Sequence, residues 1–434
     1  MHAALRLGYE GTARLARASA SLAGMLPSLD AKLLRTLRAR KGIRARYRDW
    51  AAAHRDRSRP LLWMHAPSVG EGLQARPVLE LMRRRHPDVQ LAYTHFSPSA
   101  EAFARTLDVD FREYLPFDAD ADMAAALDAL RPTAIVYCKL DVWPTLSALA
   151  HERALPLGLV SATLAPSSSR RSRLATALLG DAYRALDAVG AIDDADAARL
   201  IELGVRPAVI SVTGDTRYDQ VWERAQRADR KSRMLVQLSS SRPTLVAGST
   251  WPADERVLLP AFVEARRHAP MVRLVIAPHE PTFGHITPIE AWSRNEGLQL
   301  ARLDAANAST DVILVDRVGV LGDLYALADV AFVGGGFHDA GLHSVLEPAA
   351  FGAPVLFGPR YQGSRDAQLL VMRGGGGSVA DIASVAAAIT RWLDPSPRAA
   401  AGARAKALVH DGLGAAERSL KVVESLLGGS AATT

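Results

Sequence analysis

The chain has 434 residues, of which 49% are hydrophobic and 23% charged, and its formal net charge at pH 7 is +6. This length allows two domains of ordinary size. The single cysteine, Cys138, excludes an internal disulfide framework and fits a reducing compartment. No stretch reaches the roughly 20 uninterrupted apolar residues of a membrane-spanning helix, and residues 1–30 lack the apolar core of a signal peptide.

Residues 1–50 are predicted to form a helical segment that associates with a membrane. Leucines and arginines are interspersed up to residue 26, which favours a helix lying on a bilayer surface, and packing on the protein's own body is the alternative. Ten basic residues lie between positions 35 and 59, and an anionic membrane, nucleic acid or plain solvent would suit them. They are Arg35, Arg38, Arg40, Lys41, Arg44, Arg46, Arg48, Arg55, Arg57 and Arg59.

Apolar strand-like runs alternate with amphipathic helical runs along the rest of the chain, which is typical of parallel sheets with crossover helices. The predicted fold class is α/β, with two similar open-sheet domains that face a cleft. Strands are expected near 61–65, 89–95, 134–138, 157–160, 189–192, 244–247, 273–277, 312–315, 330–333 and 355–357. The predicted divisions are a first domain at 51–217, a linker at 218–242, a second domain at 243–410, and a C-terminal helix and tail at 411–434 that packs back on the first domain.

The segment Asp329–Pro359 is the most informative part of the chain. Its apolar run Val330–Val333 ends in three glycines, including Gly335, and a loop whose second histidine is His343 leads to a predicted helix at Ser344–Glu347. Open α/β sheets bind ligands beyond the carboxyl ends of their strands. Glycines let backbone amides approach a ligand, and a helix N-terminus offers N–H groups to an anion. This unit is therefore predicted to hold the phosphate and ribose of a nucleotide.

Glu71 is the strongest candidate for acid–base chemistry. The predicted strand at 61–65 leads into Ser68-Val69-Gly70-Glu71, which places Glu71 in the first turn of a helix. Ser68 and Glu71 have the spacing of a capping box, in which each side chain bonds the other's backbone amide. Alternatively, a carboxylate at a cleft edge can take a proton from a sugar hydroxyl. The residues alone leave both interpretations open.

Other candidate groups also follow predicted strands. Lys139 and Asp141 are either a buried ion pair or catalytic groups. Arg217, near the domain junction, either neutralises a leaving phosphate or forms an interdomain salt bridge. Ser249 and Thr250 end a strand with small donors that suit phosphate oxygens.

The chain has no sequence pattern of a metal centre. Pro278 and His279 open a loop in which the histidine spacing is wrong for a zinc protease. Aspartate runs at 118–122 and 193–196 are better explained by helix N-capping. Neither the phosphate-loop nor the dinucleotide glycine pattern is present, so hydride transfer and nucleotide hydrolysis lose their main support.

Taken in order, these motifs resemble those of the bacterial 3-deoxy-D-manno-octulosonic acid (Kdo) transferases of lipopolysaccharide synthesis, from about Arg35 to Leu427. The matching segments are Ser68–Glu71, Tyr114–Asp118, Trp143–Pro144, Gly248–Pro252, Leu324–Gly335 and Leu346–Ala349. The family has the GT-B fold, usually behind an N-terminal membrane anchor. It moves Kdo from CMP-Kdo to lipid A precursors and is regarded as metal-independent.

The resemblance implies a role for each matched residue. Glu71 falls on the family's general base, and Arg217 falls where a lysine usually stabilises the leaving phosphate. The expected CMP-binding set is Ser249, Thr250, Pro278, His279, Val318, Gly319, Val320, Gly335, His343, Ser344, Val345, Leu346 and Glu347. The implied partners are CMP-Kdo, a lipid A precursor and the anionic inner-membrane surface at its cytoplasmic face, with no cofactor, metal or nucleic acid.

Several positions depart from the family pattern. Lys139 replaces one of two acidic residues before the Trp-Pro pair, Gly341–Ser344 stands for Gly-Gly-His-Asn, and Ser161–Ala165 stands for Asn-Ala-Arg-Leu-Ser. These changes leave open another CMP-nonulosonate donor or acceptor, or a non-catalytic nucleotide- or lipid-binding descendant. A nucleotide-sugar epimerase shares the two-domain fold but needs no acceptor. DNA binding lacks a recognisable recognition helix.

Overall fold

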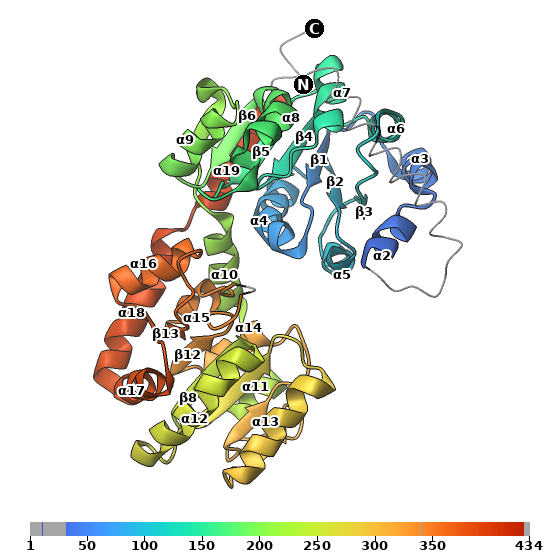
Figure 1. The fold of residues 1–434 in the computed structure, drawn as a ribbon. Coiled ribbons are helices and arrows are strands. Elements are labelled where there is room, and N and C mark those ends of the chain that lie inside the picture. The colour runs from blue at the N-terminus through green and yellow to red at the C-terminus, as the bar shows by residue number, and fades with distance from the viewer. Residues whose placement is uncertain (1–10, 12–31, 340, 429–434) are drawn as a thin grey trace. The chain divides into compact units, whose positions relative to one another are not determined.

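The computed structural model describes residue 11 and residues 32–339 and 341–428. The chain divides into two compact units (Figure 1): unit 1 comprises Met1–Gln220 and Leu413–Thr434, and unit 2 comprises Val221–Gly412. Most of the predicted membrane-associated segment therefore lies outside the described residues. Within the described ranges, no helix combines the length and apolar character needed to cross a bilayer.

Unit 1 is built on a parallel seven-stranded sheet with the order β3-β2-β1-β4-β5-β6-β7. Its strands are β1 (Leu61–His65), β2 (Gln90–His95), β3 (Phe111–Tyr114), β4 (Ala134–Cys138), β5 (Leu157–Ala162), β6 (Ala188–Ala191) and β7 (Ile210–Val212). Its helices are α2 (Lys32–Ala39), α3 (Ile43–His54), α4 (Val69–Arg85), α5 (Glu101–Ala104), α6 (Asp120–Leu130), α7 (Pro144–Glu152), α8 (Arg173–Arg184), α9 (Asp194–Glu202) and α19 (Ala415–Gly428).

The sheet of unit 1 is buried on both faces, because alternate strand residues point to opposite sides. In β1, Leu61 and Trp63 belong to one hydrophobic core, and Leu62 and Met64 belong to the other. The second core also receives α19, through residues that include Leu420 and Val423. The end of the chain thus packs back on unit 1, where Figure 1 shows α19 in red beside β5 and β6.

Unit 2 repeats the architecture with the strand order β10-β11-β9-β8-β12-β13-β14. Its strands are β8 (Thr244–Thr250), β9 (Arg273–Pro278), β10 (Leu300–Arg302), β11 (Val312–Leu314), β12 (Val330–Val333), β13 (Val355–Phe357) and β14 (Gly376–Ser378). Its helices are α11 (Arg233–Leu238), α12 (Pro252–His268), α13 (Phe283–Asn295), α14 (Leu321–Leu324), α15 (Leu346–Ala350), α16 (Arg365–Arg373), α17 (Ile382–Leu393) and α18 (Pro395–Asp411). The chain passes from unit 1 to unit 2 within α10 (Thr216–Arg227).

The predicted α/β class with two open parallel sheets of the GT-B type is confirmed. Two local predictions were wrong. Residues 218–242, expected to form a linker, supply most of α10 and all of α11, and Leu235 and Leu238 of α11 pack into a hydrophobic core of unit 2. The helix expected from Ser344 begins instead at Leu346 and has five residues.

The basic run that we predicted as a possible lipid-binding face is largely engaged within unit 1. Arg40 is 3% exposed, donates to the Leu115 carbonyl at 2.8 Å and lies 4.0 Å from the centroid of the Phe96 ring. Arg44 pairs with Asp122, and Arg46 pairs with Glu113. The remaining exposed members are Arg35, Lys41, Arg48 and Arg57. Several arginines of the basic run are engaged because α2 and α3 pack on the rest of unit 1 and direct these side chains towards it.

Candidate functional site

The Glu71 carboxylate is held by two side chains at the carboxyl ends of the central strands of unit 1. Ser68 Oγ donates to Glu71 Oε2, and Lys139 Nζ donates to Glu71 Oε1 at 3.1 Å. Ser68 is the N-cap of α4, yet its hydroxyl makes no capping bond to the helix backbone. The capping-box alternative is therefore wrong: Ser68 and Glu71 bond each other directly. The Glu71 side chain is 16% exposed, so it combines partial burial with access to solvent.

One of our alternatives was a buried ion pair between Lys139 and Asp141. In the structure, these two side chains do not pair with each other. Lys139 has a backbone φ of 68°, an unusual value for a residue with a side chain, and its ammonium contacts Glu71. Asp141 instead lies 3.2 Å from Arg170 Nη2 and 3.5 Å from His65 Nε2. Burial alone would raise the pKa of Asp141, but the His65 and Arg170 contacts outweigh it and lower that pKa.

His65 belongs to a buried polar group that sequence reasoning missed. Its side chain is fully buried at the end of β1, and its Nδ1 lies 3.0 Å from Thr94 Oγ1. Trp143 Nε1 lies 3.1 Å from His65 Nε2. The signal that was available is a histidine that ends an apolar strand, directly before the Glu71 loop. The contacts with Thr94 and Trp143 hold the His65 ring, which Asp141 contacts.

Arg217 lies in the first turn of α10, and one of its partners is in the same unit. Its Nε and Nη2 donate to Asp215 Oδ2 at 2.8 and 2.6 Å, and its backbone N–H donates to Asp215 Oδ1. Gln74 also approaches Asp215, at 3.4 Å. The guanidinium is therefore orientated by a local carboxylate, while its side chain remains 38% exposed.

The glycine-rich turn of unit 2 is held by a buried aspartate that we did not predict. Asp254 is 0% exposed, and it accepts hydrogen bonds from the backbone N–H groups of Trp251, Gly335 and Phe337 at 2.8–3.1 Å. The amide of Gly335, a residue of the expected CMP-binding set, is already bound by Asp254. The glycine at 334 has a packing role, since a Cβ there would lie 2.2 Å from a backbone oxygen.

Ser249 and Thr250 end β8 beside this turn. Ser249 has a φ of 54°, which marks a sharp change of direction at the strand end. The Thr250 hydroxyl donates to Glu255 at 2.8 Å, and the Thr250 carbonyl accepts from the backbone N–H of His279. Thr250 thus fixes the position of the Pro278–His279 loop, and its hydroxyl is occupied within the chain.

Aromatic rings from three loops meet at the carboxyl edge of the unit 2 sheet. The Trp251 ring stacks on those of His279 and His338, each with a centroid distance of 4.6 Å. The His343 ring lies 4.5 Å from that of His279, and Trp251 Nε1 donates to His343 Nε2 at 3.3 Å. Burial and the neighbouring His279 lower the pKa of His343 to about 4. Trp251 and His338 were not identified as site residues from the sequence, because the stacking of their rings depends on the course of the loops, which the sequence pattern does not indicate.

The remaining predicted binding residues differ in their access. Val318 is 75% exposed and Gly319 has a φ of +91°, so the loop at 318–320 presents its backbone at the surface. Val345 and Leu346 are 1% and 0% exposed, so both residues are buried, backbone included. Burial raises the pKa of Glu347, although Arg224 partly opposes this.

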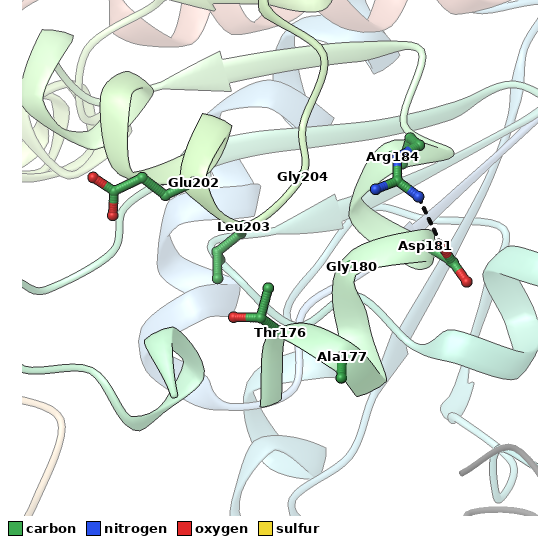
Figure 2. Close-up of a pocket in the computed structure, with 8 residues that line it drawn as sticks. All are labelled: Thr176, Ala177, Gly180, Asp181, Arg184, Glu202, Leu203 and Gly204. Atoms are coloured by element: carbon green, nitrogen blue, oxygen red, sulfur yellow. Dashed lines mark hydrogen bonds and ion pairs between the residues drawn. The ribbon is translucent and has the colours of Figure 1, made fainter. Parts of the chain in front are cut away.

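Unit 1 also has a pocket beside α8 and α9 (Figure 2), away from the candidate site. It is lined by Thr176, Ala177, Gly180, Asp181, Arg184, Glu202, Leu203 and Gly204. Arg184 and Asp181 pair with each other at 2.8 Å. None of the predicted site residues lines this pocket, and its walls are helices rather than strand ends.

The sequence is similar to those of known proteins. Residues 36–220 match the family described as 3-deoxy-D-manno-octulosonic-acid transferase (kdotransferase). The chain is 29% identical to the 3-deoxy-D-manno-octulosonic acid transferase of Chlamydophila psittaci, over 79% of each chain. It is 29% identical to that of Bordetella pertussis, over 85% of this chain and 87% of the relative.

A solved structure shares the fold at lower sequence identity. It is the UDP-GlcNAc 2-epimerase of Neisseria meningitidis, with a TM-score of 0.58 and 13% identity over 85% of this chain and 99% of that one. At this identity the likeness concerns the fold alone, whereas the relatives share sequence over most of their length. The chain is therefore similar to 3-deoxy-D-manno-octulosonic acid transferases over most of its length.

Proposed function

We propose that the protein transfers Kdo from CMP-Kdo to a lipid A precursor in lipopolysaccharide synthesis. The observation that carries the proposal is the Glu71 carboxylate, held by Ser68 and Lys139 at the strand ends of unit 1. A partly buried carboxylate with a fixed orientation can act as a general base. The epimerase alternative has only the shared fold in its support.

In the proposed reaction, Glu71 takes the proton of an acceptor hydroxyl. The hydroxyl oxygen forms a bond to the anomeric carbon of Kdo, while the bond from that carbon to the CMP phosphate oxygen breaks. The electron pair of the broken bond leaves with CMP, and the proton remains on Glu71. Each oxygen of Glu71 accepts one hydrogen bond in the described structure, and a carboxylate oxygen has a second lone pair that can accept from the acceptor hydroxyl.

Positive charge must balance the phosphate that leaves. Arg217 is proposed for this role, because its guanidinium is partly exposed and orientated by Asp215. An arginine can bind two phosphate oxygens at once. The leaving group carries one phosphate, so no bridging metal is required in the proposal, and no nucleic acid is invoked.

Unit 2 is proposed to bind CMP. Glu347 is an acceptor for the ribose hydroxyls, and the exposed loop at 318–320 and the Pro278–His279 loop provide contacts for the base. Ser249, His343 and Ser344 are the nearby groups with hydrogen-bonding capacity for the phosphate. Gly335, Thr250, Val345 and Leu346 support this site through backbone position, because their amides, hydroxyl or side chains are already engaged or buried.

We also propose that the protein works at the cytoplasmic face of the inner membrane, where its lipid acceptor would lie. The exposed Lys41 and Arg57 support attraction to anionic lipid, at about 1 kcal/mol per basic residue close to the surface. This is a smaller contribution than the whole basic run predicted, since several of its arginines are bonded within unit 1.

The decisive experiment measures CMP release from CMP-Kdo by purified protein, with and without a tetra-acylated lipid A precursor. Wild type should release CMP only with the acceptor present, and Glu71→Gln should lose about 10²–10⁴-fold in turnover while it still binds CMP. Glu202→Gln is a control with the same chemical change on a surface carboxylate of unit 1. Acceptor-independent conversion of the sugar would support the epimerase, and a failure to bind CMP would refute the donor assignment.

A further inference from the structure

Trp251 occupies the centre of the ring cluster in unit 2, and no role has been assigned to it above. Its ring stacks on His279, from the loop after β9, and on His338, from the loop after β12. Its indole N–H bonds His343, which lies later in that second loop. One side chain therefore contacts both loops that carry the proposed nucleotide ligands.

The backbone of Trp251 is tied to the same loop. Its N–H and the N–H groups of Gly335 and Phe337 share the carboxylate of Asp254. The His343 N–H in turn donates to the Gly334 carbonyl at 3.1 Å. Trp251 and His343 are thus positioned relative to each other at both backbone and side chain, which makes their hydrogen bond a fixed feature of this edge.

The direction of that hydrogen bond determines the tautomer of His343. An indole N–H can only donate, so Nε2 of His343 must accept, and the proton of the neutral imidazole must be on Nδ1. The low pKa of His343, which burial and His279 produce, keeps the ring neutral at pH 7. Within the described part of the chain, Nδ1 of His343 has no hydrogen-bond partner, so its N–H is a donor available to a ligand.

We propose that Trp251 is a positioning residue for the donor nucleotide, which holds His343 in the Nδ1–H form so that this N–H donates to an oxygen of CMP. The inference rests on the proposed function, because it takes CMP as the ligand. Trp251 makes no contact with the reacting atoms in this scheme and acts only through His343. The predicted consequence is that the indole N–H matters more than the aromatic surface that surrounds it.

The first test reads the tautomer directly, without any activity. Long-range ¹⁵N–¹H spectra distinguish the two ring nitrogens of a histidine, and His343 is assigned by comparison with His343→Asn. Wild type should show the Nδ1–H form, and Trp251→Phe, which keeps the stacking and removes the N–H, should show a mixture. Trp292→Phe is the matched control, since Trp292 packs on Phe262 in the core of the same unit. A wild-type Nε2–H form would overturn the proposal.

The second test measures CMP affinity by calorimetry. Trp251→Phe should weaken CMP binding about tenfold, a change typical of one lost hydrogen bond, and Trp292→Phe should not. In His343→Asn, the amide nitrogen replaces Nδ1 and cannot tautomerise, so adding Trp251→Phe to it should cause little further loss. An equal loss in both backgrounds would show that Trp251 acts on the loop rather than through His343.

The two proposals fail in different ways. A wild-type protein that does not bind CMP refutes the proposed function, and with it the ligand assigned to His343. A wild-type protein that binds CMP, with affinity and tautomer unchanged in Trp251→Phe, refutes only the positioning role. A circular dichroism spectrum of Trp251→Phe that matches wild type shows that the comparison is made on folded protein.

Discussion

The two units present different chemistry at the same structural position. At the strand ends of unit 1, charged side chains bond one another, as in the pairs Glu71–Lys139 and Asp141–Arg170. At the strand ends of unit 2, the described groups are rings, glycines and a fully buried aspartate, Asp254. Both units have the same architecture, with the carboxyl ends of the parallel strands along one edge of the sheet. The residues at that edge determine whether it suits proton transfer or nucleotide binding.

The difference extends to how each edge holds its acidic group. Glu71 is bonded by side chains that can move, and its side chain is 16% exposed. Asp254 is bonded by three backbone N–H groups and has no exposure. The first arrangement leaves a carboxylate that can exchange partners during a reaction. The second arrangement uses a carboxylate to fix a loop.

Arg217 is the strongest test of this division between proton transfer in unit 1 and nucleotide binding in unit 2, because it lies in unit 1 yet is proposed to act on the donor phosphate. Arg217→Ala should lower turnover by about 10²–10³-fold, the usual effect of removing one donor from developing negative charge. Arg217→Lys keeps the positive charge and should keep most of the activity. Single-turnover CMP release measures both. Arg206→Ala, on the surface of unit 1, is the control, and equal activity of Arg217→Ala and wild type would contradict the assignment.

Asp254→Ala tests whether the buried aspartate of unit 2 is structural. It would leave three backbone N–H groups without their acceptor, which should lower the free energy of unfolding by about 3 kcal/mol. Asp304→Ala removes an exposed aspartate that pairs with Arg317 in the same unit, and it should change that free energy by less than about 1 kcal/mol. Urea unfolding compares the two variants. Similar effects would show that Asp254 does not hold the turn.

The central strands of both sheets were predictable, whereas their edges were not. All ten predicted strands are present, and the four that were missed are β3, β7, β10 and β14. Each of them lies at one end of a seven-stranded sheet. An edge strand is covered less completely, so it needs no long apolar run: β7 is exposed at Ser211 and Val212, and β14 is Gly-Gly-Ser. Composition therefore predicts the middle of a parallel sheet better than its edges.

The positions of the site residues were predictable, but their partners were not. Glu71 and Lys139 meet because β1 and β4 are neighbours and their carboxyl ends share one edge. The strand alternation cannot indicate that Lys139 adopts a positive φ and bonds Glu71 rather than Asp141. Likewise, three consecutive glycines indicate close backbone packing, but the carboxylate that binds Gly335 comes from a helix 81 residues earlier.

Lys139→Met tests whether the strand ends of unit 1 contribute to turnover but not to CMP binding. It removes the ammonium that holds Glu71 and keeps a side chain of similar length, so turnover should fall about tenfold with CMP affinity unchanged. Lys139→Arg should retain more activity than Lys139→Met. Steady-state kinetics and calorimetry measure the two effects separately. A loss of CMP affinity in Lys139→Met would place part of the donor site in unit 1.

The smallest expected effect is a pH dependence of stability that arises, in each unit, from a histidine whose pKa is lowered. Burial lowers the pKa of His95 in unit 1 to about 4, despite a contact with the Ser97 carbonyl, and burial and His279 lower the pKa of His343 in unit 2 to about 4. Both values lie below the ordinary 6.5, so between pH 6.5 and 4 the unfolded chain binds protons that the folded chain does not. Stability should therefore fall as pH falls through this window.

His95→Gln isolates the contribution of unit 1, because glutamine does not titrate in this range. Wild type should lose about 1 kcal/mol more of its free energy of unfolding than His95→Gln between pH 7 and pH 5.5. His343→Gln should show a smaller difference, since His95 is only 2% exposed while His343 is partly exposed and water can solvate its charge. Urea unfolding at the two pH values tests this. If neither variant flattens the pH dependence, the histidines of both units are protonated in the folded state at pH 5.5, and the contrast in burial has no consequence for stability.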